Sequence, residues 1–354
     1  MNKLFTKRFG ALMISIFLIS SVSFSQFDNV DFLKSGTTDA VKLMQAYITP
    51  WANAFGAGLN GSWYNTAKPH KFGGFDITTG INVGMVPSSA DTYDITKIGL
   101  TANITGGTMA PSISGPSSGT TPTLTYSTSG VTVASFNAPP GTTWRYMPVP
   151  TAQIGIGLPL GTEIKARFIP KIKIQNGDIS LWGVGIMHSL MQYIPGHKLI
   201  KADVSLFAGY TKLQGNIPVH LNPDPSLLSS TIPANTSFDN QKAYMSIDAL
   251  NIGLIGSFNL PVITFYGGIG YGKTGTDVEF KGNYPLPGIV STPAPHAENL
   301  LKTGSQFPVI DIKNFAGLRA NIGLRIKLAV ITIHADYTKA QYDVASAGLG
   351  ISFR

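Results

Sequence analysis

The pair His188-Ser189 is the nearest that this sequence comes to a catalytic arrangement. An imidazole beside a hydroxyl can accept the hydroxyl proton during nucleophilic attack when an acid orients the imidazole. The residues around the pair alternate in polarity as a strand does, and neighbours on a strand point to opposite faces. Proton transfer between these two side chains therefore has poor geometry, and we expect the protein not to be an enzyme.

Metal and cofactor chemistry is not indicated either. The six histidines, at positions 70, 188, 197, 220, 296 and 334, have no paired ligand spacing, and the chain has no cysteine. A zinc site needs such a set of ligands. The glycine-rich run 267–272 matches neither the dinucleotide-binding fingerprint nor the phosphate-binding loop. The net charge of +8 is too diffuse to indicate nucleic-acid binding.

Charged side chains at alternate positions are the other groups that could do chemistry. Arg319, Arg325 and Lys327 each stand between apolar residues. This period of two is typical of a strand with one apolar and one polar face. The same alternation predicts nine lumen-facing residues if the strands form a barrel: Asp76, Lys165, Arg167, Asp203, Arg319, Arg325, Lys327, His334 and Asp336.

Three strands with this pattern end the chain. They cover 316–328, 331–338 and 345–353 and are joined by very short turns. A strand that crosses a bilayer at a tilt needs about 9 to 11 residues, whereas soluble strands average about five or six. A soluble antiparallel sandwich also alternates, but the length of these strands favours a transmembrane barrel.

Nine further strand-like segments precede these three. They are 55–63, 75–85, 93–104, 152–158, 164–174, 179–190, 202–213, 244–260 and 262–273. About twelve strands is an even number, as in bacterial barrels, and a hairpin within 123–136 would raise the count to fourteen. We therefore predict an all-β fold, a transmembrane antiparallel β-barrel of about twelve strands with a short N-terminal helix.

The connections between these strands support the barrel. Three long polar insertions, near 105–151, 214–243 and 274–313, fall on one side of the predicted barrel, and short turns fall on the other. Long outer loops and short periplasmic turns are the rule for outer-membrane barrels. The expected barrel spans residues 51–354.

The N-terminal region reads as an export signal and a lead-in. Residues 1–25 have a positive start, a short apolar run and small residues at the end, as a cleaved signal peptide does. In residues 26–50, plausible caps at Thr38 and Asp39 predict a short amphipathic helix that ends near Pro50. This segment is either periplasmic or a plug in the barrel mouth.

Several runs resemble an uncharacterised family of predicted outer-membrane β-barrel proteins from Bacteroidetes-type bacteria. They are AYITP at 46–50, FGAGLN at 55–60, GSWYNTAKPHKFGGFDI at 61–77 and GIMHSLMQYIPG at 185–196. Together with the C-terminal strands they cover most of the chain after the signal peptide. The resemblance implies a barrel in the bacterial outer membrane and brings no activity with it. One departure is Arg354 after Phe353, because barrel assembly signals usually end in an aromatic residue.

These observations predict an outer-membrane channel or transporter for small solutes, hydrophobic ones included. A structural or interaction barrel that acts through its long loops is the alternative, and a lipid hydrolase built on His188 is a remote one. The expected partners are outer-membrane lipid, lipopolysaccharide and the barrel-assembly machinery. Lys68, His70 and Lys71 form a basic tip in the predicted first outer loop, which is either a solvated turn or a lipopolysaccharide phosphate contact.

Overall fold

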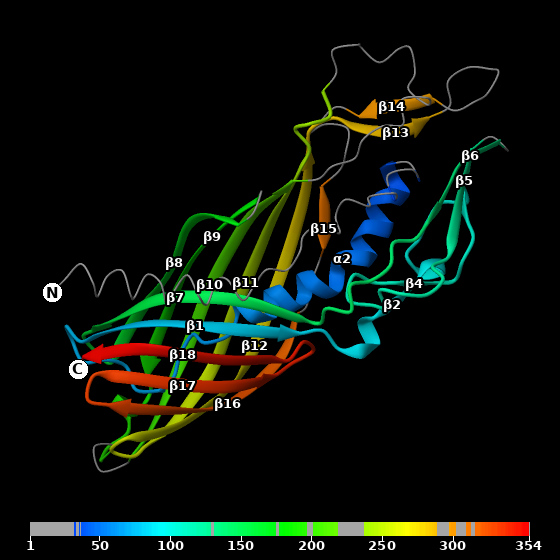
Figure 1. Ribbon diagram of the computed structural model, residues 1–354. Helices are drawn as coiled ribbons and strands as arrows, with labels where there is room; N and C mark the ends of the chain where they lie inside the picture. The colour runs from blue at the N-terminus through cyan, green and yellow to red at the C-terminus, as the bar shows by residue number, and fades with distance from the viewer. Residues whose placement is uncertain are drawn as a thin grey trace.

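Ten long strands form a closed antiparallel barrel in the computed structural model (Figure 1). The structure describes residues 32, 35, 37–128, 131–174, 177–196, 201–218, 237–288, 297–301, 309–312 and 316–353. The barrel strands are β1 (Phe75–Met85), β7 (Tyr146–Leu158), β8 (Thr162–Ile174), β9 (Gly177–Ser189), β10 (Ala202–Pro218), β11 (Lys242–Asn259), β12 (Ile263–Lys281), β16 (Ala316–Leu328), β17 (Ile331–Lys339) and β18 (Val344–Phe353). Each pairs with its sequence neighbour in this set, and β1 with β18 closes the ring.

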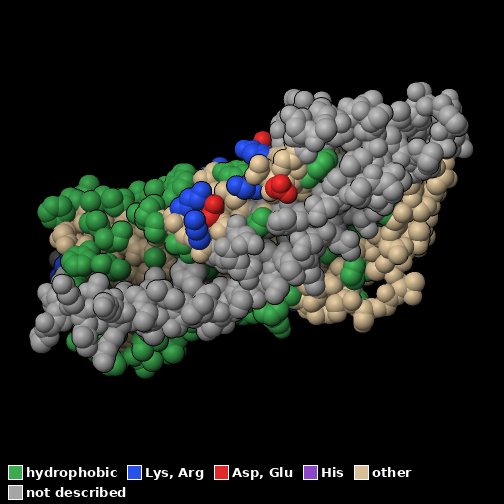
Figure 2. All heavy atoms as spheres, turned by 45° about the horizontal axis from the view of Figure 1, so that its top comes forward, with side chains coloured by type: hydrophobic (Ala, Val, Ile, Leu, Met, Phe, Trp, Pro, Cys, Tyr) green, Lys and Arg blue, Asp and Glu red, His purple; other side chains and the backbone are tan. Residues whose placement is uncertain are grey.

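The alternation in sequence becomes an outer and an inner face. On β16, Leu318 and Ile322 are 82% and 73% exposed, whereas Arg319 and Arg325 between and beyond them are buried. The same holds on β17, where Ile333 is exposed and His334 is buried. An apolar exterior around a polar interior is the arrangement of a transmembrane barrel, and Figure 2 shows hydrophobic side chains covering the end of the barrel away from the long loops.

The two ends of the barrel differ as predicted. At one end the connections 159–161, 260–262 and 329–330 are short, and both Phe75 and Phe353 lie there in register. At the other end the connections 86–145, 219–241 and 282–315 are long. We call these the short-turn end and the long-loop end.

The long connections contain secondary structure of their own. The described elements are β2 (Thr92–Asp94), β3 (Ile104–Thr105), β4 (Met109–Pro111), β5 (Thr123–Thr128), β6 (Val131–Asn137), β13 (Tyr284–Gly288), β14 (Ala297–Leu301) and β15 (Ile310–Ile312), with short 3₁₀ helices at Ser88–Ala90 and Ile95–Lys97. A further 3₁₀ helix, Met191–Tyr193, lies in connection 190–201 at the short-turn end. β15 extends the sheet from β12, and the other strands form small separate sheets. Figure 1 shows β5, β6, β13 and β14 projecting beyond the barrel.

Helix α2 (Thr37–Leu59) lies inside the long-loop end of the barrel (Figure 1). It contacts β1, β7, β11, β12 and β15. From its end, residues 60–74 run along the lumen to the short-turn end, where β1 begins. We call α2 together with residues 60–74 the plug.

The plug and the wall approach each other closely at glycines. A Cβ atom on Gly84 of β1 would come within 2.0 Å of the Ala54 carbonyl oxygen of α2. A Cβ on Gly185 or Gly209 would come within 2.9 or 2.8 Å of the Trp63 ring. Side chains at these wall positions would collide with the plug, so glycine is what allows the barrel to hold it.

The predicted strand count was too high by two. Segment 55–63 is the end of α2 and the turn after it. Gly56 and Gly58 lie against the wall side chains of Thr274 and Val149, so their place between larger residues reflects close helix–wall packing and not a strand. Segment 93–104 contributes only short strands outside the barrel. The hairpin expected within 123–136 exists as β5 and β6, but it belongs to a separate three-stranded sheet, so the count of fourteen is also wrong.

The N-terminal helix is longer than predicted. It continues through Pro50 to Leu59, although an internal proline removes one backbone donor. The helix changes direction along its length (Figure 1), as expected of a helix with an internal proline. Among the described residues, no helix is long and apolar enough to cross a membrane. The predicted signal peptide, residues 1–25, lies outside the described residues.

Candidate functional site

The nine predicted lumen residues lie on inward-facing positions of the barrel strands. Seven are buried: Asp76, Lys165, Arg167, Arg319, Arg325, His334 and Asp336. Lys327 and Asp203 are half-buried near the short-turn end. The Lys327 Nζ donates to the Ser352 carbonyl oxygen at 3.1 Å, and the Asp203 carboxylate accepts from the Asn259 side-chain amide at 2.6 Å.

Arg167 clamps the end of α2 to the wall. Its Nη1 donates to the Leu59 carbonyl oxygen at 2.8 Å and its Nη2 to the Gly61 carbonyl oxygen at 2.6 Å. Its Nε donates to Gln153 Oε1 of β7 at 3.1 Å. The guanidinium carbon also lies 3.7 Å from the centre of the Trp63 ring, within the range of a cation–π contact. Every part of this group is therefore engaged, mostly by the plug.

Arg319 holds the same turn from the opposite side of the lumen. Its Nη1 donates to the Asn60 carbonyl oxygen at 2.6 Å, and its Nη2 donates to Thr338 Oγ1 at 3.3 Å. Three consecutive carbonyl groups, those of Leu59, Asn60 and Gly61, thus face two arginines. The last carbonyls of a helix have no partner within the helix, and the partial negative charge of the helix end favours cations there.

Residues after the clamp are held by hydroxyls and aromatic packing. Ser205 Oγ donates to the Ala67 carbonyl oxygen at 2.6 Å, and the Ala67 N–H donates to Ser257 Oγ at 3.1 Å. Trp63 and Ala67 pack with Met187, Phe207 and Ile255 in a small apolar cluster. This part of the plug, residues 63–67, is therefore held by hydroxyl groups of the wall and by aromatic packing.

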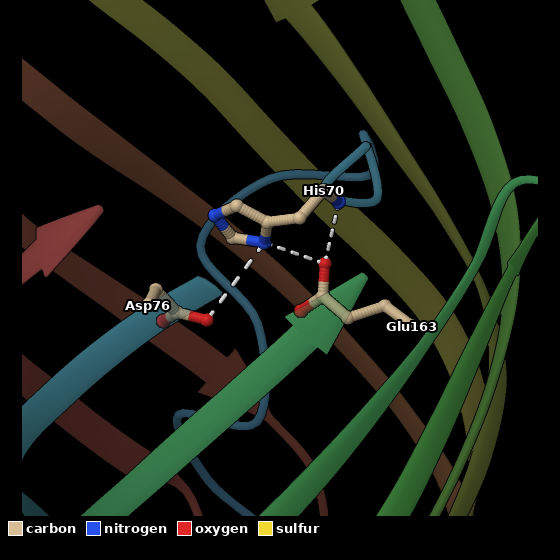
Figure 3. A group of neighbouring side chains, drawn as sticks. All are labelled: His70, Asp76 and Glu163. Atoms are coloured by element: carbon tan, nitrogen blue, oxygen red, sulfur yellow. Dashed lines mark hydrogen bonds and ion pairs between the residues drawn. The ribbon is translucent and has the colours of Figure 1, made fainter. Parts of the chain in front are cut away.

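A second polar cluster holds the plug at the short-turn end. The His70 backbone N–H and Nδ1 both lie 2.8 Å from Glu163 Oε2, and Nε2 lies 3.0 Å from Ser352 Oγ. Figure 3 shows the imidazole between Glu163 of β8 and Asp76 of β1, with Nδ1 3.9 Å from Asp76 Oδ1. His70 thus joins the plug to three different strands.

Lys165 balances the charge of this cluster. Its ammonium group pairs with Glu163 Oε1 and lies 3.9 Å from Asp76 Oδ1. Asp76 Oδ2 accepts a hydrogen bond from Thr78 Oγ1 at 2.8 Å. The ligand atoms of His70, Asp76 and Glu163 lie within 4.8 Å of one another, close enough for a metal ion. A dication would have to displace Lys165 or repel it at close range, so the residues present fit an ion-pair network better than a metal site.

The remaining predicted residues form contacts within the wall. Asp336 accepts a hydrogen bond from the Tyr266 hydroxyl at 3.0 Å. The His334 ring packs on Gly348 of β18, where an added Cβ atom would come within 2.4 Å of the ring. Arg325 Nη2 lies 3.5 Å from Ser352 Oγ, beside the His70 cluster. The sequence therefore placed these side chains on the correct face, while their partners come from strands that it could not place side by side.

Two members of the site were missed by sequence reasoning. Glu163 stands two residues before Lys165 and so shares its face, and that spacing could have revealed it. His70 was expected at the basic tip of an outer loop, and this was wrong, because residues 60–74 run through the lumen and do not connect two strands. Its neighbours Lys68 and Lys71 are exposed.

An apolar cavity of about 50 Å³ lies between α2 and the inner face of β11 and β12. Its lining includes Ile48, Trp51, Phe55, Met245 and Val278. An engineered cavity that binds benzene is about three times as large, at roughly 150 Å³. The cavity therefore does not accommodate an alkyl chain in this conformation.

His188 and Ser189 point to opposite faces of β9, as predicted. Ser189 is buried on the inner side, where its Oγ accepts from the Met191 N–H at 3.3 Å. His188 lies between Thr162 Oγ1 at 2.8 Å and the Tyr193 hydroxyl at 3.0 Å. The described contacts of the two side chains do not form a nucleophile and base pair.

Residues 1–353 match a protein family described as a family of unknown function, DUF6588. The chain belongs to this family. The match, together with the closed barrel, confirms the resemblance to an uncharacterised barrel family; the bacterial group remains an expectation. No curated protein matches the sequence of this DUF6588 member.

Solved structures that resemble this DUF6588 barrel include outer-membrane proteins. Ail of Yersinia pestis has 8% identity and a TM-score of 0.26, with 80% of this chain and 98% of Ail covered. The outer membrane protease OmpT of Escherichia coli has 8% identity and a TM-score of 0.33, over 81% of this chain and 100% of OmpT. A FadL homologue of Pseudomonas aeruginosa has 10% identity and a TM-score of 0.19, over 85% and 96%. At these scores the barrel assignment rests on the strand pairing described above.

Proposed function

We propose that this protein is an outer-membrane channel or transporter that passes small solutes when its plug shifts within the barrel. The supporting observation is how the plug is held. Wall side chains such as Arg167, Arg319 and Ser205 donate to plug carbonyls, and water or a solute can replace such contacts. A barrel of about eight strands fills its own lumen with side chains. This barrel has ten strands, and the plug occupies the space that its wall side chains leave.

The outer-membrane location belongs to the same proposal. Large apolar side chains cover the outside of the barrel, with Leu318, Ile322 and Phe168 all more than 60% exposed. Exposed apolar surface of this extent is stable in lipid and not in water. We propose a polar solute as the main substrate and not a hydrophobic one, because the apolar cavity beside α2 is only about 50 Å³.

Single-channel recording tests the proposal through a variant that loosens the plug. Arg167→Met keeps an apolar stem against Trp63 and removes the donors to Leu59, Gly61 and Gln153. We expect the wild-type protein to be closed for most of the time with brief openings, and Arg167→Met to stay open longer. Lys173→Met is the matched control, since it removes one charge from an exposed position of the same strand.

Two outcomes would count against transport. If neither the wild type nor Arg167→Met conducts, the barrel is structural and its loops carry the function. If Arg167→Met and Lys173→Met behave alike, the conducting path does not depend on the plug contacts at Arg167.

A further inference from the structure

Arg167 and Arg319 are two buried positive charges whose hydrogen bonds go to neutral groups. They are 1% and 9% exposed. Their acceptors are backbone carbonyls, the Gln153 side-chain oxygen and the Thr338 hydroxyl. The ion pairs within the part of the chain that the structure describes include neither arginine. Asp336 lies on the neighbouring strand β17, and its carboxylate accepts a hydrogen bond from the Tyr266 hydroxyl.

The plug compensates only part of this charge. The end of a helix carries a partial charge of roughly −0.5, against two full positive charges on the arginines. Burying a charge without a matching partner is costly. The contrast with Lys165 is clear, because that buried cation has the carboxylates of Glu163 and Asp76 beside it.

The plug turn beside the arginines also has polar side chains without partners. The Asn60 side-chain amide, Ser62 Oγ and Trp63 Nε1 are buried and have no hydrogen-bond partner among the described residues. Buried polar atoms are rarely left so unless water or an ion reaches them. Three of these atoms, Asn60 Nδ2, Ser62 Oγ and Trp63 Nε1, can donate a hydrogen bond to an anion.

Space for such a ligand begins at Arg319. A cavity of about 10 Å³ lies against this residue and is also lined by Tyr64, Asn251 and Asn321. This is about the size that one water molecule needs. An ion larger than water must therefore displace the carbonyls of Leu59, Asn60 and Gly61. Ser62 in this turn has a positive φ of 48°, a costly conformation for a residue with a side chain, so a rearrangement of the turn can relieve that cost.

We propose that Arg167 and Arg319 form a binding site for an oxyanion, a carboxylate or phosphate group on a small solute, which competes with the plug carbonyls for the two guanidinium groups. Oxyanions present several acceptor oxygens, as the three carbonyls do, and add a full negative charge. Guanidinium groups match carboxylate and phosphate geometry with paired hydrogen bonds. This site rests on the proposed function and gives its substrate class.

Trp63 provides an equilibrium measurement that needs no conduction. In the full chain with Trp51, Trp144 and Trp182 changed to Phe, Trp63 is the only tryptophan. Its ring stacks on Arg167, so an anion that draws the guanidinium away should change its fluorescence. Sodium phosphate and sodium propionate are titrated separately, each against sodium chloride at equal ionic strength.

We expect a saturable change with phosphate or propionate and none with chloride. The variant Arg167→Gln/Arg319→Gln should weaken the affinity at least about tenfold, whereas Arg325→Gln should leave it within about twofold, because it removes a buried arginine outside the site. If the double variant does not fold, Arg319→Lys provides the test. This variant keeps the positive charge and loses the paired N–H donors of the guanidinium group, so we expect about three- to tenfold weaker binding.

A change that follows ionic strength alone, or equal affinity in the arginine variants and Arg325→Gln, would overturn the site. These results are independent of the transport experiment. Saturable binding without conductance would retain the oxyanion site and reject transport, and conductance without saturable binding would do the reverse.

Discussion

Lys165 and Arg167 lie two residues apart on β8 and show how differently buried charges are balanced. Lys165 has two carboxylates beside it, whereas Arg167 faces carbonyl oxygens of the plug. A buried ion pair is weak evidence for net stability, but removing one partner leaves the other charge unpaired. The two residues therefore predict different outcomes on substitution.

Lys165→Met should destabilise the folded barrel by about 3–5 kcal/mol, because it leaves the buried carboxylates of Glu163 and Asp76 without their cation. Lys171→Met is the control. Its side chain is 65% exposed in a pair with Asp178, and such surface pairs contribute about 0–1 kcal/mol. Urea unfolding in detergent micelles measures both. Equal effects of the two changes would mean that Lys165 does not neutralise the cluster.

The free-energy cost of an arginine on the outer face depends on its position along the strand. Ile322→Arg should hinder folding into lipid by about 2–4 kcal/mol, because Ile322 lies in the middle of β16 and is 73% exposed on the apolar face. Leu328→Arg at the short-turn end of the same strand should cost about 0–1 kcal/mol. Folding yields into lipid vesicles, measured at increasing urea concentrations, compare the two variants. The opposite order would show that the bilayer does not surround this part of the barrel.

At the scale of elements, α2 lies very close to the wall at points where either the helix or the wall has a glycine. Gly84 faces the Ala54 carbonyl, and Gly58 of the helix faces Val149 of β7. These close approaches keep helix and sheet in van der Waals contact. The plug is therefore positioned by backbone proximity as well as by hydrogen bonds.

Gly84→Ala should destabilise the barrel by about 1–3 kcal/mol, since its methyl group would overlap the Ala54 carbonyl oxygen, a backbone atom that cannot rotate away. Gly275→Ala on β12 is the matched change, because an added Cβ there meets no atom within 4 Å. Thermal unfolding followed by gel mobility measures the pair. A neutral effect of Gly84→Ala would place α2 further from β1 than described.

The sequence predicted elements well where a residue faces lipid on one side and polar groups on the other. That contrast gives the period of two in β16, β17 and β18, and it put Arg319 and His334 on the correct face. It fails for a segment that faces the lumen on all sides. Residues 55–63 were predicted as a strand because Phe55, Ala57, Leu59, Gly61 and Trp63 occupy every second position, whereas in the structure they are the end of α2 and the turn after it, packed against the wall.

The same limit explains the errors at the site. His70 of the plug and Glu163 of β8 are in contact although they are far apart in the sequence. No local sequence pattern encodes such a long-range contact. Their neighbours Asp76 and Lys165 were found from alternation alone. The sequence therefore shows on which face of a strand a side chain lies, whereas the contacts between wall and plug are visible only in the structure.

At the scale of the whole molecule, strands β10, β11 and β12 are the longest, with 17, 18 and 19 residues. Crossing a bilayer takes only about 9–11 residues, so these strands extend beyond the membrane at the long-loop end. Lys212 and Asp248 pair there at 3.2 Å on the outer face. Figure 2 shows charged side chains gathered between the hydrophobic part of the barrel and the long loops, as expected above a lipid boundary.

The mature protein should fractionate with outer membranes and show heat-modifiable gel mobility, because a closed barrel with an apolar exterior resists unfolding in detergent until it is heated. Cell fractionation followed by gels of heated and unheated samples tests this. Recovery in the soluble periplasmic fraction would contradict the location in the outer membrane.

We propose that solutes pass only when the plug moves relative to the wall, and a reversible cross-link between plug and wall tests this. The sequence has no cysteine, so Gly58→Cys/Val149→Cys introduces the only pair. A Cβ on Gly58 would lie 3.3 Å from the Val149 Cβ, near the roughly 3.5–4.5 Å that a disulfide requires. Each single cysteine variant is the control.

In single-channel recordings, the oxidised double variant should show no openings, and reduction of the same channels should restore openings of wild-type size and frequency. The single variants should respond to neither treatment. Openings of equal size and frequency in the oxidised and reduced double variant would rule out gating by the plug, because the plug would then be fixed while solutes still pass.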